Sequence, residues 1–312
     1  MSVLFTFPGQ GAQKPGMLHS LPSHPETMRT LSAASRVLGC DVLTHDSAAA
    51  LRSTVAVQLC LLVAGVAMAR VLAAHGARPS MVAGLSIGAW PAAVIAQVLD
   101  FADAVRLVAL RARLMEEAYP AGYGMTAVTG LTARQLELLL AKVHGPATPV
   151  YLANLNAERQ LVISGAEPAM ARVAALALQH GALRAERLAV PVPSHCELLA
   201  SQSKQLVRAM EGLPLQRPAI TYISSSTARA LFDGRAIGAD LAANMARPVL
   251  WADTLRHAWE RGARLAVEMP SGSVLTRLAE PVFAEGRAMC CDGSRLDSVV
   301  SAVQDQQASP QS

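Results

Sequence analysis

Two short apolar runs, each ending in a glycine-containing turn, constrain the fold of this 312-residue chain most strongly. Val3–Phe7 stops at Pro8-Gly9-Gln10-Gly11, and Ser80–Gly84 stops at a second turn. Between them lies Thr54–His75, a long helical segment that is apolar on almost every side. Continuous apolar runs are typical of strands buried on both faces. The alternation of strands and helices therefore predicts an α/β fold with a mostly parallel sheet covered on both sides.

The middle of the chain has a different order of elements. The order β-α-β-β-α-β is that of a ferredoxin-like unit, so we expect an inserted α+β subdomain over residues 124–190. The larger domain then consists of residues 1–123 and 191–312. The strands of the subdomain are expected at Met125–Thr129, Val150–Ala153, Gln160–Ser164 and Arg184–Val190, and its helices at Thr132–Val143 and Glu167–His180.

Charge and composition narrow the classes of partner. The chain has 27 basic and 23 acidic residues, a net charge of +4, and only 16% charged against 52% hydrophobic residues. The basic residues are scattered and form no run, which argues against nucleic-acid binding. A modest positive field suits an anionic small molecule or an acidic protein partner.

Cysteine usage and apolar segments indicate the compartment. Five cysteines without regular spacing favour a reducing compartment over a disulfide framework. Met1–Gln10 has no basic region followed by a long apolar one, so no signal peptide is expected. Leu59–Ala69 is too short for a membrane span and predicts a buried helix. We expect a cytoplasmic protein with no membrane segment, whose polar end Gln304–Ser312 frays.

The strongest chemical signal is Gly84-Leu85-Ser86-Ile87-Gly88, a G-x-S-x-G between a predicted strand and a predicted helix. This context is typical of a nucleophile elbow, in which a tight turn presents the serine above the sheet. The turn also directs the N–H of Ile87 at a developing oxyanion. The alternative is a chance glycine-serine turn. We favour Ser86 as a nucleophile.

A serine nucleophile needs a base, and its substrate needs binding groups. Among eight histidines, His195 lies in a proline-stiffened segment entering a helix, whereas the others suit surface or capping positions. Gln10 lies in the loop after the first strand, where α/β sheets place ligands. Arg111 lies near the apolar face of a predicted helix and needs a partner such as a carboxylate. The residues alone do not distinguish it from Arg106 and Arg113.

These elements occur together, in this order, in one family. The segments FPGQGAQ, GLSIG, RARLM and VPSHC make the chain resemble the malonyl-CoA:acyl-carrier-protein transacylases. The similarity extends into Ala242–Trp251 and Glu268–Thr276, so it covers nearly the whole chain. It implies an α/β-hydrolase-like core with a ferredoxin-like insertion.

The resemblance also implies a mechanism without a metal or bound cofactor. Malonyl-CoA is the expected substrate, and the acceptor is the phosphopantetheine-type thiol of an acyl carrier protein. The implied roles are nucleophile for Ser86, general base for His195, carboxylate binding for Arg111, backbone oxyanion-hole donors for Gln10 and Ile87, and a backbone carbonyl that orients His195 for Asn244. A Ser–His dyad then suffices without an acid.

Some positions depart from the usual family pattern. Leu85 and Ala89 replace a histidine and an acid, Asn244 a glutamine, and Arg247 an asparagine. In this pattern the chain looks most like the epsilon subunit of malonate decarboxylase, which charges the carrier subunit of that complex. One alternative is a malonyl transacylase of fatty-acid or polyketide synthesis.

Two further alternatives are an enzyme that catalyses a different reaction and a protein that catalyses none. A serine esterase of similar core would need an acid to orient its histidine, and Asp233 and Asp292 are the available loop candidates. A non-catalytic docking subunit of a decarboxylase complex would not need Ser86 for transfer.

Overall fold

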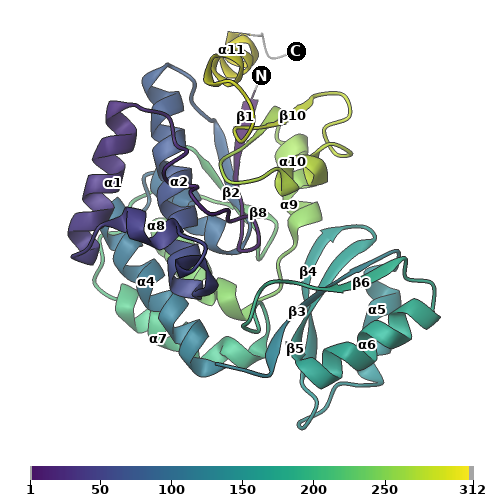
Figure 1. The fold of residues 1–312 in the computed structure, drawn as a ribbon. Helices are drawn as coiled ribbons and strands as arrows, with labels where there is room; N and C mark the ends of the chain where they lie inside the picture. Colours follow the sequence, from purple (N-terminus) through teal and green to yellow (C-terminus); the bar gives the residue numbers. More distant parts are fainter. Residues whose placement is uncertain (1, 309–312) are drawn as a thin grey trace.

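The computed structural model describes residues 2–308, which form a large α/β part and a smaller α+β part (Figure 1). The sheet of the large part has the strand order β10-β9-β1-β2-β7-β8. All neighbours pair in parallel except β7 and β8, so the expected α/β class with a mostly parallel sheet is confirmed. The strands are β1 (Ser2–Phe7), β2 (Met81–Gly84), β7 (Thr221–Ser224), β8 (Arg229–Leu231), β9 (Ala263–Glu268) and β10 (Arg287–Cys290).

Helices cover both faces of this sheet because its strands are apolar on both sides. Val3, Phe5 and Phe7 of β1 join one buried cluster, whereas Leu4 joins the cluster on the opposite face. Helices α9 (Trp251–Glu260) and α10 (Val274–Ala279) cover the Leu4 face. The other face is covered by α1 (Pro25–Leu38), α2 (Thr54–Ala74), α3 (Ala89–Ile95), α4 (Phe101–Ala118), α7 (Ala200–Met210), α8 (Gly234–Ala243) and α11 (Leu296–Ala308).

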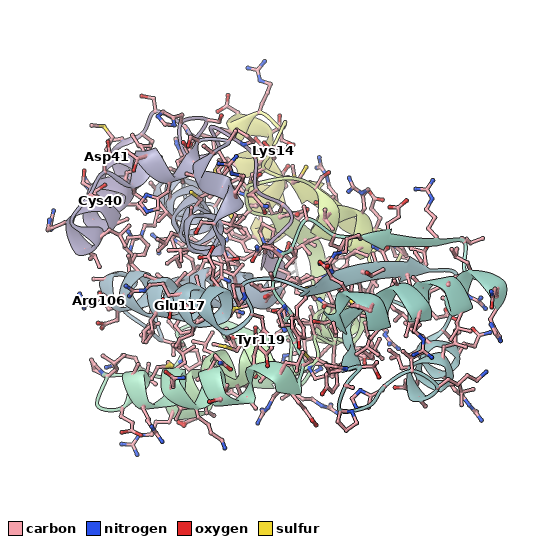
Figure 2. The ribbon with its side chains drawn as sticks, turned by 60° about the horizontal axis from the view of Figure 1, so that its bottom comes forward. Lys14, Cys40, Asp41, Arg106, Glu117 and Tyr119 are labelled. Atoms are coloured by element: carbon pink, nitrogen blue, oxygen red, sulfur yellow. The ribbon has the colours of Figure 1, made fainter. Side chains whose placement is uncertain are left out.

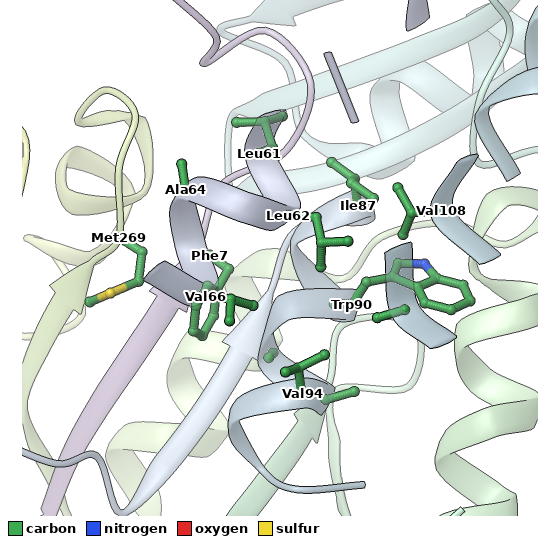
Figure 3. Packing of buried hydrophobic residues seen from close by; sticks show 14 of the residues in the cluster. Phe7, Leu61, Leu62, Ala64, Val66, Ile87, Trp90, Val94, Val108 and Met269 are labelled. Atoms are coloured by element: carbon green, nitrogen blue, oxygen red, sulfur yellow. The ribbon is translucent and has the colours of Figure 1, made fainter. Parts of the chain in front are cut away.

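Helix α2 is the central helix of the larger cluster. It is long and apolar enough to cross a membrane, but 89% of its most apolar window is buried inside the protein. Figure 3 shows Leu62 and Val66 of this helix among Phe7 of β1 and Trp90 of α3. A Cβ on Gly65 would meet the Phe7 ring at 2.9 Å, so glycine lets the helix approach the strand closely. Helix α2 therefore serves as core, as its composition predicts.

The smaller part has its own antiparallel sheet, with the strand order β4-β5-β3-β6. Helices α5 (Ala133–Ala141) and α6 (Glu167–Gln179) cover one of its faces and share a separate apolar cluster with it. The chain order β-α-β-β-α-β is the predicted one. The strands are β3 (Tyr123–Thr129), β4 (Val150–Ala157), β5 (Gln160–Ala166) and β6 (Arg184–Arg187).

Backbone hydrogen bonds join β4 to the large part. The Leu155 N–H donates to the Val249 carbonyl at 2.8 Å, and the Val249 N–H donates to the Ala153 carbonyl at 2.8 Å. This bridge fixes the smaller sheet beside the carboxyl ends of β1 and β2.

The structure also corrects some expectations. The strand expected at Arg184–Val190 ends at Arg187, and the three residues that follow it line a cavity. Helix α11 continues to Ala308, so fraying from Gln304 was wrong for 304–308, and 309–312 lie outside the described residues.

Candidate active site

Ser86 occupies the turn between β2 and α3. The residue is 8% exposed and has a φ of 57°, a left-handed conformation that is unusual for serine. A Cβ on Gly84 would collide with the Gly88 carbonyl, and one on Gly88 would collide with the Phe7 carbonyl. The G-x-S-x-G pattern is thus required by close backbone contacts, and it produces the strained turn that presents the serine hydroxyl.

His195 lies directly beside Ser86. Its Nε2 is 2.8 Å from the Ser86 Oγ, and its Nδ1 is 2.9 Å from the Asn244 carbonyl and 3.2 Å from the Arg247 carbonyl. Carbonyl oxygens only accept hydrogen bonds, so the proton of the neutral ring belongs on Nδ1. Nε2 is then free to accept the Ser86 proton, which is the arrangement a general base needs.

Burial keeps this ring neutral. His195 is 2% exposed, and its pKa is lowered from 6.5 to about 4, first by desolvation and then by the positive charge of Arg111. The hydrogen bonds to the Asn244 and Arg247 carbonyls act in the opposite direction. A base that is neutral at pH 7 is ready to take a proton.

Arg111 lies inside the site with a guanidinium that is only partly satisfied. The residue is 0% exposed; its Nη1 donates to Gln58 Oε1 at 2.6 Å and its Nη2 donates to Ser86 Oγ at 3.4 Å. Its Nε has no partner, and none of the ion pairs within residues 2–308 includes it. Burial lowers the pKa of Arg111 to about 9, so it stays charged at pH 7. A buried, unpaired cation beside a nucleophile suits a substrate carboxylate.

The neighbouring arginines of α4 are different. Arg106 lies at the outer edge of the molecule, where it pairs with Asp103 (Figure 2). Arg113 is exposed. The structure therefore makes the distinction that the sequence alone leaves open.

A cavity of about 280 Å³ opens above Ser86 and His195, between the two sheets. It is lined by the loop after β1, including Gln10, and by residues of the smaller sheet, including Asn154 and Gln160. The two catalytic candidates thus face a space with walls from both parts of the molecule.

The proposed oxyanion donors lie next to Ser86. Ile87 is in the first turn of the helix that follows the elbow, so its N–H has no intrahelical acceptor. The N–H of Gln10 makes no backbone hydrogen bond within residues 2–308. The loop that carries Gln10 is held against the elbow, because the Leu85 N–H donates to the Phe7 carbonyl at 3.0 Å.

Two contacts escaped the sequence reasoning. Gln58 orients Arg111, and the signal was present, since Gln58 is a polar residue inside an otherwise apolar helix and is 1% exposed. Ser164 of β5 accepts a hydrogen bond from the Ser194 N–H at 2.8 Å, and no local pattern could have revealed this contact.

The acids considered for an esterase lie elsewhere. Asp233 caps the N-terminus of α8, and Asp292 pairs with Lys14 and accepts from the Gly272 N–H. Within residues 2–308, no cluster of three or more His, Cys, Asp or Glu side chains is placed to hold a metal.

Comparisons with known proteins agree with this geometry. The acyl transferase domain family matches residues 4–308. A malonyl CoA-acyl carrier protein transacylase from Haemophilus influenzae is 36% identical over 290 residues, which cover 91% of this chain and 93% of that protein.

Solved structures agree as well. The transacylase of Coxiella burnetii superposes with a TM-score of 0.91 at 31% identity and 97% coverage of both chains. A malonyl-transacylase in complex with a type II polyketide acyl carrier protein gives a TM-score of 0.90 at 32% identity, covering 98% of this chain and 100% of that one. The chain therefore belongs to the malonyl-CoA:acyl-carrier-protein transacylase family of acyl transferases.

Proposed function

We propose that this enzyme transfers a malonyl group from malonyl-CoA to the thiol of an acyl carrier protein through a malonyl-Ser86 intermediate. The observation that carries the proposal is the buried, unpaired Arg111 guanidinium, which lies 3.4 Å from the nucleophilic oxygen. A free carboxylate on the acyl group satisfies this cation, whereas a neutral acyl group leaves it unpaired. The names of the relatives support the same donor and acceptor.

The first half-reaction acylates the enzyme. His195 Nε2 takes the Ser86 proton as Oγ attacks the thioester carbonyl, and the N–H groups of Gln10 and Ile87 stabilise the oxyanion. When the intermediate collapses, the C–S bond breaks and the imidazolium returns the proton to the leaving CoA sulfur. The Asn244 and Arg247 carbonyls stabilise the imidazolium, so a Ser–His dyad needs no acidic third member.

The second half-reaction repeats these steps in reverse. The carrier thiol gives its proton to His195 and attacks malonyl-Ser86, which releases the malonyl thioester and restores the serine. The relatives include a transacylase solved with its acyl-carrier protein, which supports a carrier-protein partner for this chain.

For the identity of the carrier, we favour the carrier subunit of malonate decarboxylase. The support is the pattern at Leu85, Ala89, Asn244 and Arg247, in which the chain resembles the epsilon subunit of that complex. A role in fatty-acid or polyketide synthesis fits the comparisons equally well. The free cysteines within residues 2–308 support a reducing, cytoplasmic location for either role.

Intact-mass measurement tests the proposal. Incubation with malonyl-CoA should add one malonyl group, which peptide mapping places on Ser86, and the Ser86→Ala variant should take up none. Candidate carrier proteins added to the loaded enzyme should discharge it at different rates, and the carrier subunit of malonate decarboxylase should be the fastest. Full transfer by Ser86→Ala would contradict the mechanism and favour a docking subunit. Steady ester hydrolysis without transfer to any thiol would favour an esterase.

A further inference from the structure

Asn244 contacts the catalytic histidine with its backbone and a polar cluster with its side chain. Its carbonyl accepts from His195 Nδ1 at 2.9 Å, and its amide Nδ2 donates to Ser226 Oγ at 3.2 Å. Asn244 is 0% exposed, and its Oδ1 has no partner within residues 2–308. The bond to Ser226 is the hydrogen bond of this side chain, and it adds to the backbone bond from the Asn244 N–H to the Asp240 carbonyl in holding the residue.

The Asn244 carbonyl has an electrostatic role that depends on its direction. Asn244 follows the last residue of α8, so its carbonyl belongs to the negative end of the helix dipole. Pointed at Nδ1, this end stabilises the imidazolium that forms during acyl transfer. A small rotation of the residue would weaken that interaction.

Ser226 is itself held by a buried acid. Ser224 at the end of β7 accepts from the Ser226 N–H at 3.2 Å and donates its own hydroxyl to Asp240 Oδ1 at 2.9 Å. Asp240 lies on α8, one helical turn before Asn244, and is 5% exposed. The bonds form a path from Asp240 through Ser224 and Ser226 to Asn244, and the Asn244 N–H closes it by donating to the Asp240 carbonyl.

The side chain of Asp240 is buried among hydroxyl groups. Its pKa is raised overall by burial, and the Ser224 hydroxyl, the Arg247 charge and the Ser226 and Tyr222 hydroxyls offset part of this rise. Its Oδ2 lacks a partner at ideal hydrogen-bond geometry, which leaves an acceptor beside these hydroxyls. A buried acid is costly unless polar neighbours compensate it, and here they surround the turn that supports Asn244.

We propose that Asp240, acting through Ser224 and Ser226, is a positioning residue that holds the Asn244 carbonyl against His195. The inference rests on the proposed malonyl transfer, and it gives the dyad an acid that acts at a distance. Asp240 touches neither substrate nor His195; it sets the geometry of the base.

The test measures the rate constant for formation of malonyl-Ser86 and the final load per chain. Ser226→Ala and Asp240→Asn should each load one malonyl group, as the wild type does, but roughly tenfold more slowly. Their KM for malonyl-CoA should not change, because Arg111 and the cavity are intact. Ser226→Thr keeps the hydroxyl and should keep most of the rate. Asp233→Asn is the matched control, because it removes an acid from the cap of the same helix and leaves the path untouched.

A double variant separates a connected path from two independent effects. Ser226→Ala with Asp240→Asn should be no slower than Ser226→Ala alone, because Ser226→Ala already removes the last bond of the path and the loss of charge at Asp240 can then no longer reach Asn244. Multiplied effects would overturn the proposal, as would single variants that load within twofold of the wild-type rate. If Asp240→Asn does not fold, Ser226→Ala at a half-buried turn still tests the bond to Asn244, and loading within twofold of the wild-type rate in this variant overturns the proposal. A wild type that takes up no malonyl would instead overturn the proposed function.

Discussion

At the scale of single residues, sequence motifs identify some groups of the site but do not identify the residues that those groups contact. Ser86 and His195 stand in recognisable motifs, and the structure brings their Oγ and Nε2 atoms to 2.8 Å across 109 positions of sequence. In the sequence alone, Arg111 cannot be told apart from Arg106 and Arg113 of the same helix. Only its 0% exposure and its contact with Gln58 mark it as the buried cation of the site.

Removal of the Arg111 guanidinium should reverse the acyl preference. In Arg111→Ala, we expect kcat/KM for malonyl-CoA to fall roughly 100-fold, because a charge-assisted contact to the carboxylate is lost. The acetyl-CoA rate should rise relative to it. The measurement is kcat/KM for both thioesters, with Arg113→Ala as the exposed control on the same helix. An unchanged malonyl/acetyl ratio would remove the carboxylate-binding role.

The lowered pKa of His195 predicts an unusual acid limb. The ring works as a base only when neutral, and its folded pKa is about 4 instead of 6.5. As pH falls, kcat/KM should stay level through 6.5 and decline only as pH approaches about 4. A pH profile of acylation checks this. Half-maximal activity near pH 6.5 would show that the ring is not desolvated in the working enzyme.

At the scale of elements, the central strands and the long helix α2 were predicted, whereas the edge strands and the core helices α10 and α11 were not. The apolar runs at β1 and β2 and the long helix α2 follow from pattern alone, because burial on all sides demands apolar residues. Strands β8 and β10 were not predicted. Both lie at the edges of the sheet, are short, and have exposed arginines at their first positions. Tertiary pairing, and not local pattern, creates them.

The nucleophile elbow should tolerate no Cβ at its closing glycine. Gly88→Ala places a methyl group against the Phe7 carbonyl, so we expect a loss of about 3 kcal/mol in the free energy of unfolding or loss of the fold. Gly145→Ala is the control, because its new Cβ would meet Thr148 at an ordinary 3.5 Å. Denaturant titration of both variants measures the difference. Equal midpoints for Gly88→Ala and the wild type would mean that the turn is not tightly packed.

At the scale of the whole molecule, the site depends on how the two sheets meet. The cavity is lined by the loop after β1 and by the smaller sheet. Neither segment predicts from its own sequence that it lies beside the other. The ferredoxin-like arrangement of the smaller part was predictable from the succession of strands and helices along the chain. Its placement was not, because the bridge between β4 and Val249 joins positions almost a hundred residues apart.

The contact of Ser164 with the segment around His195 should make the position of His195 depend on the smaller sheet. Ser164 of the smaller sheet is 0% exposed, accepts from the Ser194 N–H at 2.8 Å, and lies 3.8 Å from Cys196 Sγ. Ser164 therefore contacts the residues on both sides of His195. These contacts stabilise the left-handed backbone of His195, which has a φ of 62°.

Ser164→Ala leaves the buried Ser194 N–H unpaired, which should cost about 1–3 kcal/mol in the free energy of unfolding. Formation of malonyl-Ser86 should slow as well, because His195 loses its hold from the smaller sheet. Ser80→Ala is the matched comparison, because it also removes a serine hydroxyl that accepts from a backbone N–H, that of Val3 at 2.9 Å, away from His195. Denaturation curves and single-turnover acylation measure the two effects. A variant that loses stability but acylates at the wild-type rate would show that the smaller sheet shapes the cavity without positioning the base.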